Sequence, residues 1–102
     1  MITTTVRFRL PKTLQTCEAK ELFLNSAPAF QKVPGLLRKH FLLSEDGTHA
    51  GGVYLWRERA SAEAFIENVL INMIKEKYGS EPEIDYFSSP VLVDNINTEI
   101  VT

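Results

Sequence analysis

The sequence predicts an α+β domain in which two helices cover one face of a four-stranded antiparallel sheet, with the element order βαββαβ. Three observations predict this class. Apolar residues alternate near the start of the chain, two segments repeat apolar residues at helical spacing, and a short polar loop joins two strand-like stretches between those segments. The 102 residues are enough for one domain, residues 1–102, to bury its own core.

The first part of the chain predicts a strand followed by a long helix. Residues Ile2–Leu10 alternate between apolar and polar side chains, so we expect a strand with one buried face. Apolar residues then recur at helical spacing over Thr13–Val33, and we expect Pro28 to kink or split this helix. Pro34 and Gly35 are expected to end it, because neither favours a continuing helix.

The middle of the chain predicts a β-hairpin. Leu36–Leu43 and Ala50–Trp56 are rich in residues that suit strands, and the loop between them is expected to turn at Asp46 and Gly47. If the last residue of the first strand pairs with Ala50, antiparallel counting gives three more pairs on the same face. These pairs are Phe41 with Gly52, Lys39 with Tyr54, and Leu37 with Trp56.

The last part of the chain predicts another helix and a final strand. Ser61 suits the N-cap position, apolar residues then follow one helical face as far as Lys77, and Gly79 is placed to end the helix. Ile84–Val93 has strand-like composition, but Pro90 restricts it to an edge position, a bend or two shorter pieces.

The resulting ferredoxin-like arrangement leaves one sheet face without helices. We expect this face to carry apolar side chains, and the simplest cover for a chain of this size is a second copy related by a two-fold axis. A homodimer is therefore expected, and the tail Asn95–Thr102 could extend across the neighbouring chain.

Composition limits the partners and the compartment. A net charge of −2 and a pI near 5.6 argue against a nucleic-acid partner held by phosphate contacts. The single cysteine cannot form an intrachain disulfide, and no apolar run resembles a signal peptide or a membrane span. We therefore expect a cytoplasmic protein with neither a nucleic-acid nor a membrane partner.

A candidate ligand site lies at the strand with two adjacent glycines. A glycine inside a strand often marks a place where another group approaches the backbone, and Gly51 and Gly52 do so together. Phe41 is one candidate for the approaching group, because an aromatic ring across a strand glycine is stabilising. A bound ligand is the other candidate.

Aromatic and basic residues flank these glycines. Tyr54 and Trp56 offer an aromatic wall with polar ends, although both also suit core packing or a dimer contact. The adjacent strand offers a charge or a titratable group for a small aromatic or anionic ligand, from Arg38, Lys39 or His40. These basic residues equally suit a solvated strand face, and the strand register decides which of them meets the ligand.

The segment from Pro34 to Trp56 resembles the core signature of the YdhR-type monooxygenase family, in the dimeric α/β-barrel superfamily. The shared features are a Pro-Gly pair after the first helix, a lysine in an aromatic second strand, and a Gly-Gly-aliphatic-Tyr-Leu-aromatic run. In this chain, the matching positions are Pro34, Gly35, Lys39, Phe41, Gly51, Gly52, Val53, Tyr54, Leu55 and Trp56.

The resemblance implies a reaction without a cofactor. Related dimeric barrels are associated with oxygenation in which a deprotonated phenol or quinol reacts with dioxygen itself. Tyr54 and Trp56 would then bind the ring, and His40 would accept the proton. Lys39 or Arg38 would stabilise the anion. The chain also lacks a dinucleotide fingerprint, a Cys/His metal spacing and a nucleophile elbow, so no cofactor and no metal are expected.

Two other classes of function remain open. A non-catalytic dimer could bind a small metabolite at the same site. The same element order also builds RNA-recognition modules, whose third strand places aromatic residues two positions apart, as Tyr54 and Trp56 are. The acidic charge and the lack of a matching aromatic residue in the first strand disfavour RNA.

Overall fold

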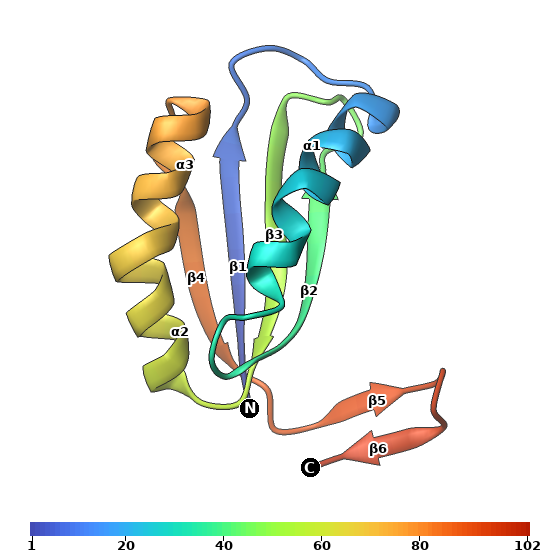
Figure 1. The fold of residues 1–102 in the computed structure, drawn as a ribbon. Helices are drawn as coiled ribbons and strands as arrows, with labels where there is room; N and C mark the ends of the chain where they lie inside the picture. Colours follow the sequence, from blue (N-terminus) through green and yellow to red (C-terminus); the bar gives the residue numbers. More distant parts are fainter.

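The computed structural model describes residues 1–102 and shows the predicted βαββαβ order (Figure 1). The elements are β1 (Ile2–Arg9), α1 (Thr16–Phe30), β2 (Leu36–Leu43), β3 (His49–Trp56), α2 (Arg59–Phe65), the π-helical stretch η1 (Ile66–Leu70), α3 (Ile71–Tyr78) and β4 (Glu83–Ser88). The segments α2, η1 and α3 follow one another without a break and together form the second helix. Two further strands, β5 (Leu92–Asp94) and β6 (Glu99–Val101), form a separate hairpin.

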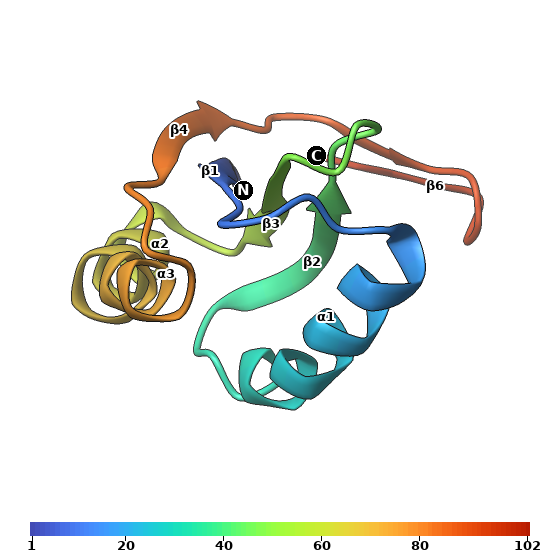
Figure 2. The same cartoon turned by 90° about the horizontal axis from the view of Figure 1, so that it is seen from above.

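The main sheet contains four antiparallel strands in the order β2-β3-β1-β4. Both helices lie on one face of this sheet, and the opposite face carries no helix (Figure 2). Side chains between the sheet and the helices form the core, among them Val6 and Phe8 of β1 and Ile66 and Leu70 of the second helix. The predicted ferredoxin-like fold is therefore confirmed.

The pairing of β2 with β3 determines which residues share the site. Two predicted pairs are confirmed, Phe41 with Gly52 and Lys39 with Tyr54. The third is wrong, because Trp56 lies opposite Leu36 and not Leu37. The register shifts between Leu36 and Arg38, so Leu37 is an extra residue on β2, as in a β-bulge.

Both helices differ in detail from the sequence prediction. α1 continues through Pro28 as one helix, so the proline does not split it. The second helix begins at Arg59 with Glu58 as its N-cap, so Ser61 lies in the first turn instead of capping it. It ends at Gly79 as predicted, and the φ of 70° there is a left-handed conformation that glycine favours. None of the helices combines the length and the apolar character needed to cross a membrane.

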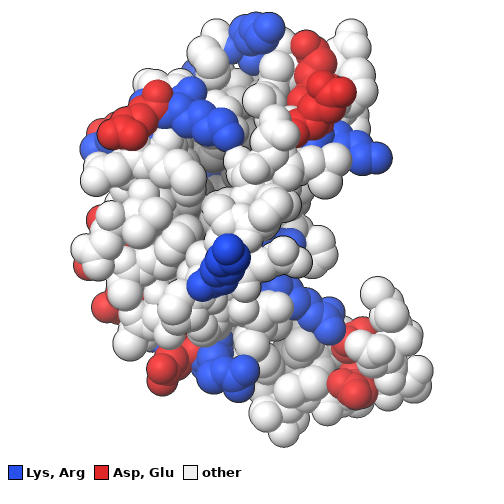
Figure 3. All heavy atoms as spheres, viewed as in Figure 1, with Lys and Arg blue, Asp and Glu red and all other residues white.

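The chain after β4 leaves the main sheet. Pro90 lies between β4 and β5, so the predicted strand is realised as two shorter pieces. The tail pairs with β5 as β6, and this hairpin projects away from the main sheet (Figure 1). Asp94 anchors it by accepting hydrogen bonds from Arg38 Nη2 and from the backbone N–H groups of Ile96 and Asn97. An open notch separates the hairpin from the rest of the chain on the side shown in Figure 3.

Candidate active site

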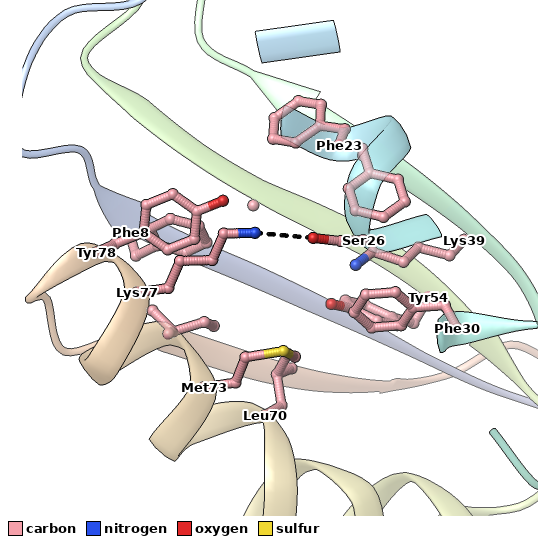
Figure 4. A pocket seen from close by; sticks show the side chains of 13 residues that line it. Phe8, Phe23, Ser26, Phe30, Lys39, Tyr54, Leu70, Met73, Lys77 and Tyr78 are labelled. Atoms are coloured by element: carbon pink, nitrogen blue, oxygen red, sulfur yellow. Dashed lines mark hydrogen bonds between the residues drawn. The ribbon is translucent and has the colours of Figure 1, made fainter. Parts of the chain in front are cut away.

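A cavity lies between the helix-covered face of the sheet, α1 and the second helix (Figure 4). Its volume is about 40 Å³, and nine of its 13 lining residues are hydrophobic. We call it the aromatic cavity, because its wall includes six aromatic side chains, those of Phe8, Phe23, Phe30, Phe41, Tyr54 and Tyr78. The polar side chains in the wall are Ser26, Lys39 and Lys77.

The sheet and α1 supply their lining residues by simple periodicity. Alternate residues of a strand share a face, so the residues of β2 and β3 that face the helices include Lys39 and Tyr54. Phe23, Ser26 and Phe30 are three and four residues apart in α1, so they lie along one side of that helix. The floor and one wall therefore follow directly from the strand and helix repeats.

The second helix supplies the other wall and contains an irregular turn. η1 is π-helical, and π-helical turns are rare and often occur at functional sites. Leu70, at the end of η1, lines the cavity together with Met73, Ile74 and Lys77 of α3. The sequence predicts a regular helix here, because so short a π-helical stretch barely changes the spacing of apolar residues.

Lys39 places a primary amine against the aromatic wall. Its Nζ lies 3.3 Å from the ring centroid of Phe30, 3.7 Å from that of Phe41 and 4.6 Å from that of Tyr54. No carboxylate pairs with this amine. Burial, and to a smaller extent the positive charge of Lys77, lowers the pKa of Lys39 from 10.5 to about 7. A large fraction of the amine is therefore neutral at neutral pH.

The two tyrosines of the cavity keep their protons in the same pH range. Burial raises the pKa of Tyr54 and that of Tyr78 above their ordinary value of 10.0. Figure 4 shows that the Tyr54 hydroxyl and the Lys39 amine point into the same space. The cavity therefore combines a group that can accept a proton with a hydroxyl that can donate a hydrogen bond.

A hydrogen bond joins the two helices across the cavity. Lys77 Nζ donates to Ser26 Oγ over 2.9 Å, and this contact is exposed to solvent (Figure 4). Neither residue was predicted from the sequence, although Lys77 continues the helix face of Met73 and Ile74. No carboxylate lines the cavity, so its charge favours an anionic ligand over a cationic one. Elsewhere in the chain, no three His, Cys, Asp or Glu side chains converge as metal ligands would.

Trp56 lies in the core behind the cavity wall. Its side chain is fully buried, its ring stacks on that of Tyr54, and its Nε1 donates to Thr4 Oγ1 over 2.9 Å. Of the two aromatic residues predicted to form a wall, Tyr54 reaches the cavity and Trp56 supports Tyr54 from behind. Because both rings are buried under the helices, they do not form the exposed stacking surface that RNA recognition uses.

The other two basic candidates lie on the opposite side of the sheet from Lys39. His40 is exposed, and neighbouring residues of a strand point to opposite faces. Arg38 forms an ion pair with Asp94 of the C-terminal hairpin at 3.0 Å. The structure therefore does not bring His40 or Arg38 into the aromatic cavity, and Lys39 is the basic residue of β2 that lines it.

Protein atoms approach both of the paired glycines. A Cβ added at Gly51 would fall on the backbone of β1. A Cβ added at Gly52 would lie 3.0 Å from the Tyr54 ring and 3.1 Å from Lys39 Cε. Phe41 lies opposite Gly52 as predicted, but the atoms nearest to the position of a Gly52 Cβ belong to Tyr54, His40 and Lys39, so the absence of a side chain at Gly52 leaves room for the stem of Lys39.

Solved structures with a similar fold include two oxygenases. A monooxygenase from the gene ActVA-Orf6 of Streptomyces coelicolor, solved with the ligand nanaomycin D, has a TM-score of 0.64 and 17% identity over 86% of each chain. SnoaB, a cofactor-independent oxygenase from Streptomyces nogalater, has a TM-score of 0.63 and 18% identity over 86% of this chain and 91% of its own. A mutant of MhuD with two manganese protoporphyrin IX bound per active site has a TM-score of 0.67 and 16% identity, over 93% of this chain and all (100%) of its own. At these identities, the likeness shows a shared fold.

The family follows from the sequence match. Residues 4–87 match the family described as "Putative mono-oxygenase ydhR", and the chain therefore belongs to the YdhR family. This match contains every residue that lines the aromatic cavity. It confirms the resemblance seen between Pro34 and Trp56. No curated protein matches the chain.

Proposed function

We propose that the protein is a cofactor-independent monooxygenase that acts on a small electron-rich aromatic compound, of the phenol or quinol type, in the aromatic cavity. The observation that carries this proposal is the Lys39 amine, whose pKa of about 7 suits a base and which lies among aromatic rings. Membership of the YdhR family and the similar fold of a cofactor-independent oxygenase support the same class of reaction.

In this mechanism, Lys39 takes the role that the sequence analysis gave to His40. The neutral amine accepts the proton of a phenol that is bound against the rings of Phe30 and Phe41. The ammonium group that results lies beside the new phenolate and stabilises it, and the Tyr54 hydroxyl donates a hydrogen bond to the same anion. The phenolate is more readily oxidised than the phenol because it carries the full negative charge.

Dioxygen then oxidises the bound phenolate. One oxygen atom forms a new bond to a ring carbon and becomes a quinone carbonyl, and the other leaves as water. The substrate supplies all of the electrons, and the two protons of the water come from the phenol and from the oxygenated ring carbon. The reaction therefore needs no external reductant.

Substrate entry requires the cavity to open. Its volume of about 40 Å³ has room for about three water molecules, which is less than an aromatic ring needs. The hydrogen bond between Lys77 and Ser26 is the contact that spans the space between α1 and α3. An exposed hydrogen bond contributes only about 0.5–1.5 kcal/mol, so the helices can separate here at small cost.

We further propose that the protein is a homodimer. The sheet face without helices exposes Leu42 and Phe87, and the C-terminal hairpin exposes Ile96 and Ile100. A second copy related by a two-fold axis would cover both surfaces. In such a dimer, the hairpin of each chain would extend across its neighbour, as the sequence analysis expected of the tail.

Oxygen uptake with a panel of phenols and quinols tests the proposed reaction. At least one compound should drive oxygen consumption, at a rate that rises with pH through about 7 and then levels, because Lys39 must be neutral to accept the proton. Lys39→Met should remove this activity. Lys20→Met, which alters an exposed lysine of α1, is the matched control and should leave the rate unchanged.

Two outcomes would contradict the proposal. Activity that disappears with a chelator and returns with a metal would rule out the cofactor-independent mechanism. If no phenol or quinol causes oxygen uptake while one of them still binds, the non-catalytic metabolite-binding dimer would be the better description.

A further inference from the structure

Lys39 has the surroundings of a nucleophilic amine as well as those of a base. Its Nζ rests on the faces of three aromatic rings, and no protein carboxylate neutralises it. Lysine amines that attack carbonyl compounds are often activated in two ways together. The side chain is desolvated in an apolar pocket, and a second cation lies nearby. The second cation here is Lys77, which also lines the aromatic cavity.

The cavity is closer in size to a short anionic molecule than to a phenol. Its volume of about 40 Å³ corresponds to about three water molecules, so a three-carbon acid requires less opening of the helices than a phenol does. The head of Lys77 is held by the neutral hydroxyl of Ser26 and not by a carboxylate, so its charge is available to a carboxylate on the ligand. A carbonyl group beside that carboxylate would then lie between the two amines.

We propose that the Lys39 amine forms an imine with a short 2-oxo acid, whose carboxylate pairs with Lys77. The nitrogen forms a bond to the carbonyl carbon, the carbonyl oxygen leaves as water, and the two amine hydrogens leave in that water. Nothing is oxidised or reduced. This activity does not depend on dioxygen or on an aromatic substrate, so it stands apart from the oxygenation proposed above.

The reaction requires the neutral form of Lys39, and the groups around it set its pH dependence. Lys77 of α3 holds a positive charge near it, whereas Tyr54 of β3 and Tyr78 of α3 stay protonated because burial raises the pKa of each. α1 contributes no titratable side chain to the cavity. Imine formation should therefore accelerate as the pH rises through about 7, following Lys39 alone.

Reductive trapping with pyruvate and cyanoborohydride at neutral pH tests the proposal. One lysine per chain should gain an adduct, with a mass gain equal to that of pyruvic acid less one oxygen atom, and peptide mapping should place it on Lys39, apart from any label on the α-amino group of Met1. At neutral pH the neutral fraction of Lys39 exceeds that of an ordinary lysine by about a thousandfold, so Lys39 should react at least about tenfold faster than any other lysine.

Three variants distinguish imine formation in the cavity from labelling of surface lysines. Lys39→Arg keeps the positive charge but is not a nucleophile, and it should lose the adduct. Lys20→Met removes an exposed lysine and should leave the adduct unchanged. Lys77→Met should reduce the preference for pyruvate over acetone, which lacks the carboxylate, by about tenfold.

A contrary result is easily recognised. Label that spreads over the exposed lysines, or that persists on the lysines of a folded Lys39→Arg variant, would overturn the proposal. Equal rates with pyruvate and acetone would overturn the role of Lys77. Trapping that succeeds when no phenol or quinol drives oxygen uptake would leave this inference standing and remove only the oxygenase.

Discussion

Lys39 is subject to two opposing effects. Removing an ammonium group from water costs several kcal/mol, whereas contact with aromatic faces returns about 0.5–2 kcal/mol. The nearby charge of Lys77 adds to the cost. Desolvation is the larger effect, and the pKa of Lys39 therefore falls to about 7 instead of remaining at 10.5. The same imbalance gives the cavity an amine that can accept a proton or attack a carbonyl.

Lys39→Met should stabilise the fold in mildly acidic solution. Between about pH 7 and 10.5, the unfolded chain holds more protons at this lysine than the folded chain does, so the stability of the unaltered protein rises with pH across that window. The variant lacks this rise. At a pH below 7, we expect it to gain at least about 1 kcal/mol, or ~4–8 °C in Tm, and the gain should vanish above about pH 10.5.

Thermal unfolding of the unaltered protein and of the variant, at one pH on each side of this window, measures the effect. Lys20→Met should leave the Tm unchanged at both pH values, because that side chain is exposed. A methionine variant that is less stable than the unaltered protein in mild acid would show that desolvation does not dominate at Lys39.

The two glycines of β3 should differ in their tolerance of a methyl group. Gly51→Ala pushes a Cβ onto the backbone of β1, so a strand must move. Gly52→Ala meets the Tyr54 ring, the backbone oxygen of His40 and the flexible stem of Lys39, all at 3.0–3.1 Å, which is a milder overlap than the one at Gly51. Overpacking costs about 1–3 kcal/mol, and we expect Gly51→Ala near or above the upper figure and Gly52→Ala near the lower one. Chemical denaturation measures both, and equal losses would contradict the close approach of β1 to Gly51.

Among the elements, the hairpin of β5 and β6 depends on one carboxylate. Asp94 accepts hydrogen bonds from the backbone and the side chain of Asn97, from the backbone of Ile96 and from Arg38. These hydrogen bonds, led by the one from the Asn97 backbone, lower the pKa of Asp94 from 3.8 to about 2. The anionic form therefore ties the hairpin to β2.

Asp94→Asn should loosen this hairpin at neutral pH. The amides of Ile96 and Asn97 should lose protection against hydrogen exchange, because an amide oxygen is a weaker acceptor than a carboxylate. Since the pKa of Asp94 is depressed, its carboxylate stabilises the hairpin of the unaltered protein fully above about pH 4. This stabilisation disappears as the pH falls through about 2. Asp85→Asn, at an exposed position of β4, is the control, and equal losses of protection in both variants would contradict the anchoring role.

Local patterns account for most of the elements but not for their irregularities. β1 and the hairpin register near the turn were predictable, because alternation and a short loop leave few possible pairings. The pairing of Trp56 was not, since the extra residue Leu37 is apolar like its neighbours and shows no break in the pattern. The strand segment after Ile84 could be read as one piece or two, and only the pairing with β6 decides between them.

The candidate site was predictable where it depends on the sheet alone. Lys39 and Tyr54 were identified because they are cross-strand neighbours. Lys77 and Ser26 were not, because they come from two helices that meet over the sheet only in three dimensions. Residue type alone favours His40 as the base, because histidine is the side chain that commonly accepts protons near neutral pH. Burial lowers the pKa of Lys39 to about 7 and so gives it the same ability. The burial of a single side chain cannot be predicted from composition.

The molecule as a whole has one covered and one uncovered sheet face. Phe87 and Leu42 are 53% and 43% exposed, and the C-terminal hairpin also exposes apolar side chains. Charged groups of both signs are scattered over the side shown in Figure 3, without a continuous basic patch there. The uncovered sheet face is therefore the surface on which a second copy is expected.

Sedimentation equilibrium at micromolar concentration should give about twice the chain mass of 11.6 kDa. Phe87→Arg should shift the equilibrium toward the monomer, because it places a charge in the expected interface. Leu24→Arg, at an exposed position of α1 on the helical side, should not. A monomer in the unaltered protein, or equal effects of the two variants, would contradict a dimer formed through the sheet.

Titration of Lys39 by NMR tests the central claim most directly, since both proposed reactions require a neutral amine in the aromatic cavity. With labelled lysine, the Cε and Nζ signals of the six lysines can be followed against pH, and Lys39→Arg identifies the signal of interest. We predict that this one signal titrates at about pH 7. A midpoint near the ordinary value of 10.5 would contradict it, because the amine would then be almost fully protonated at neutral pH and could neither accept a proton nor attack a carbonyl.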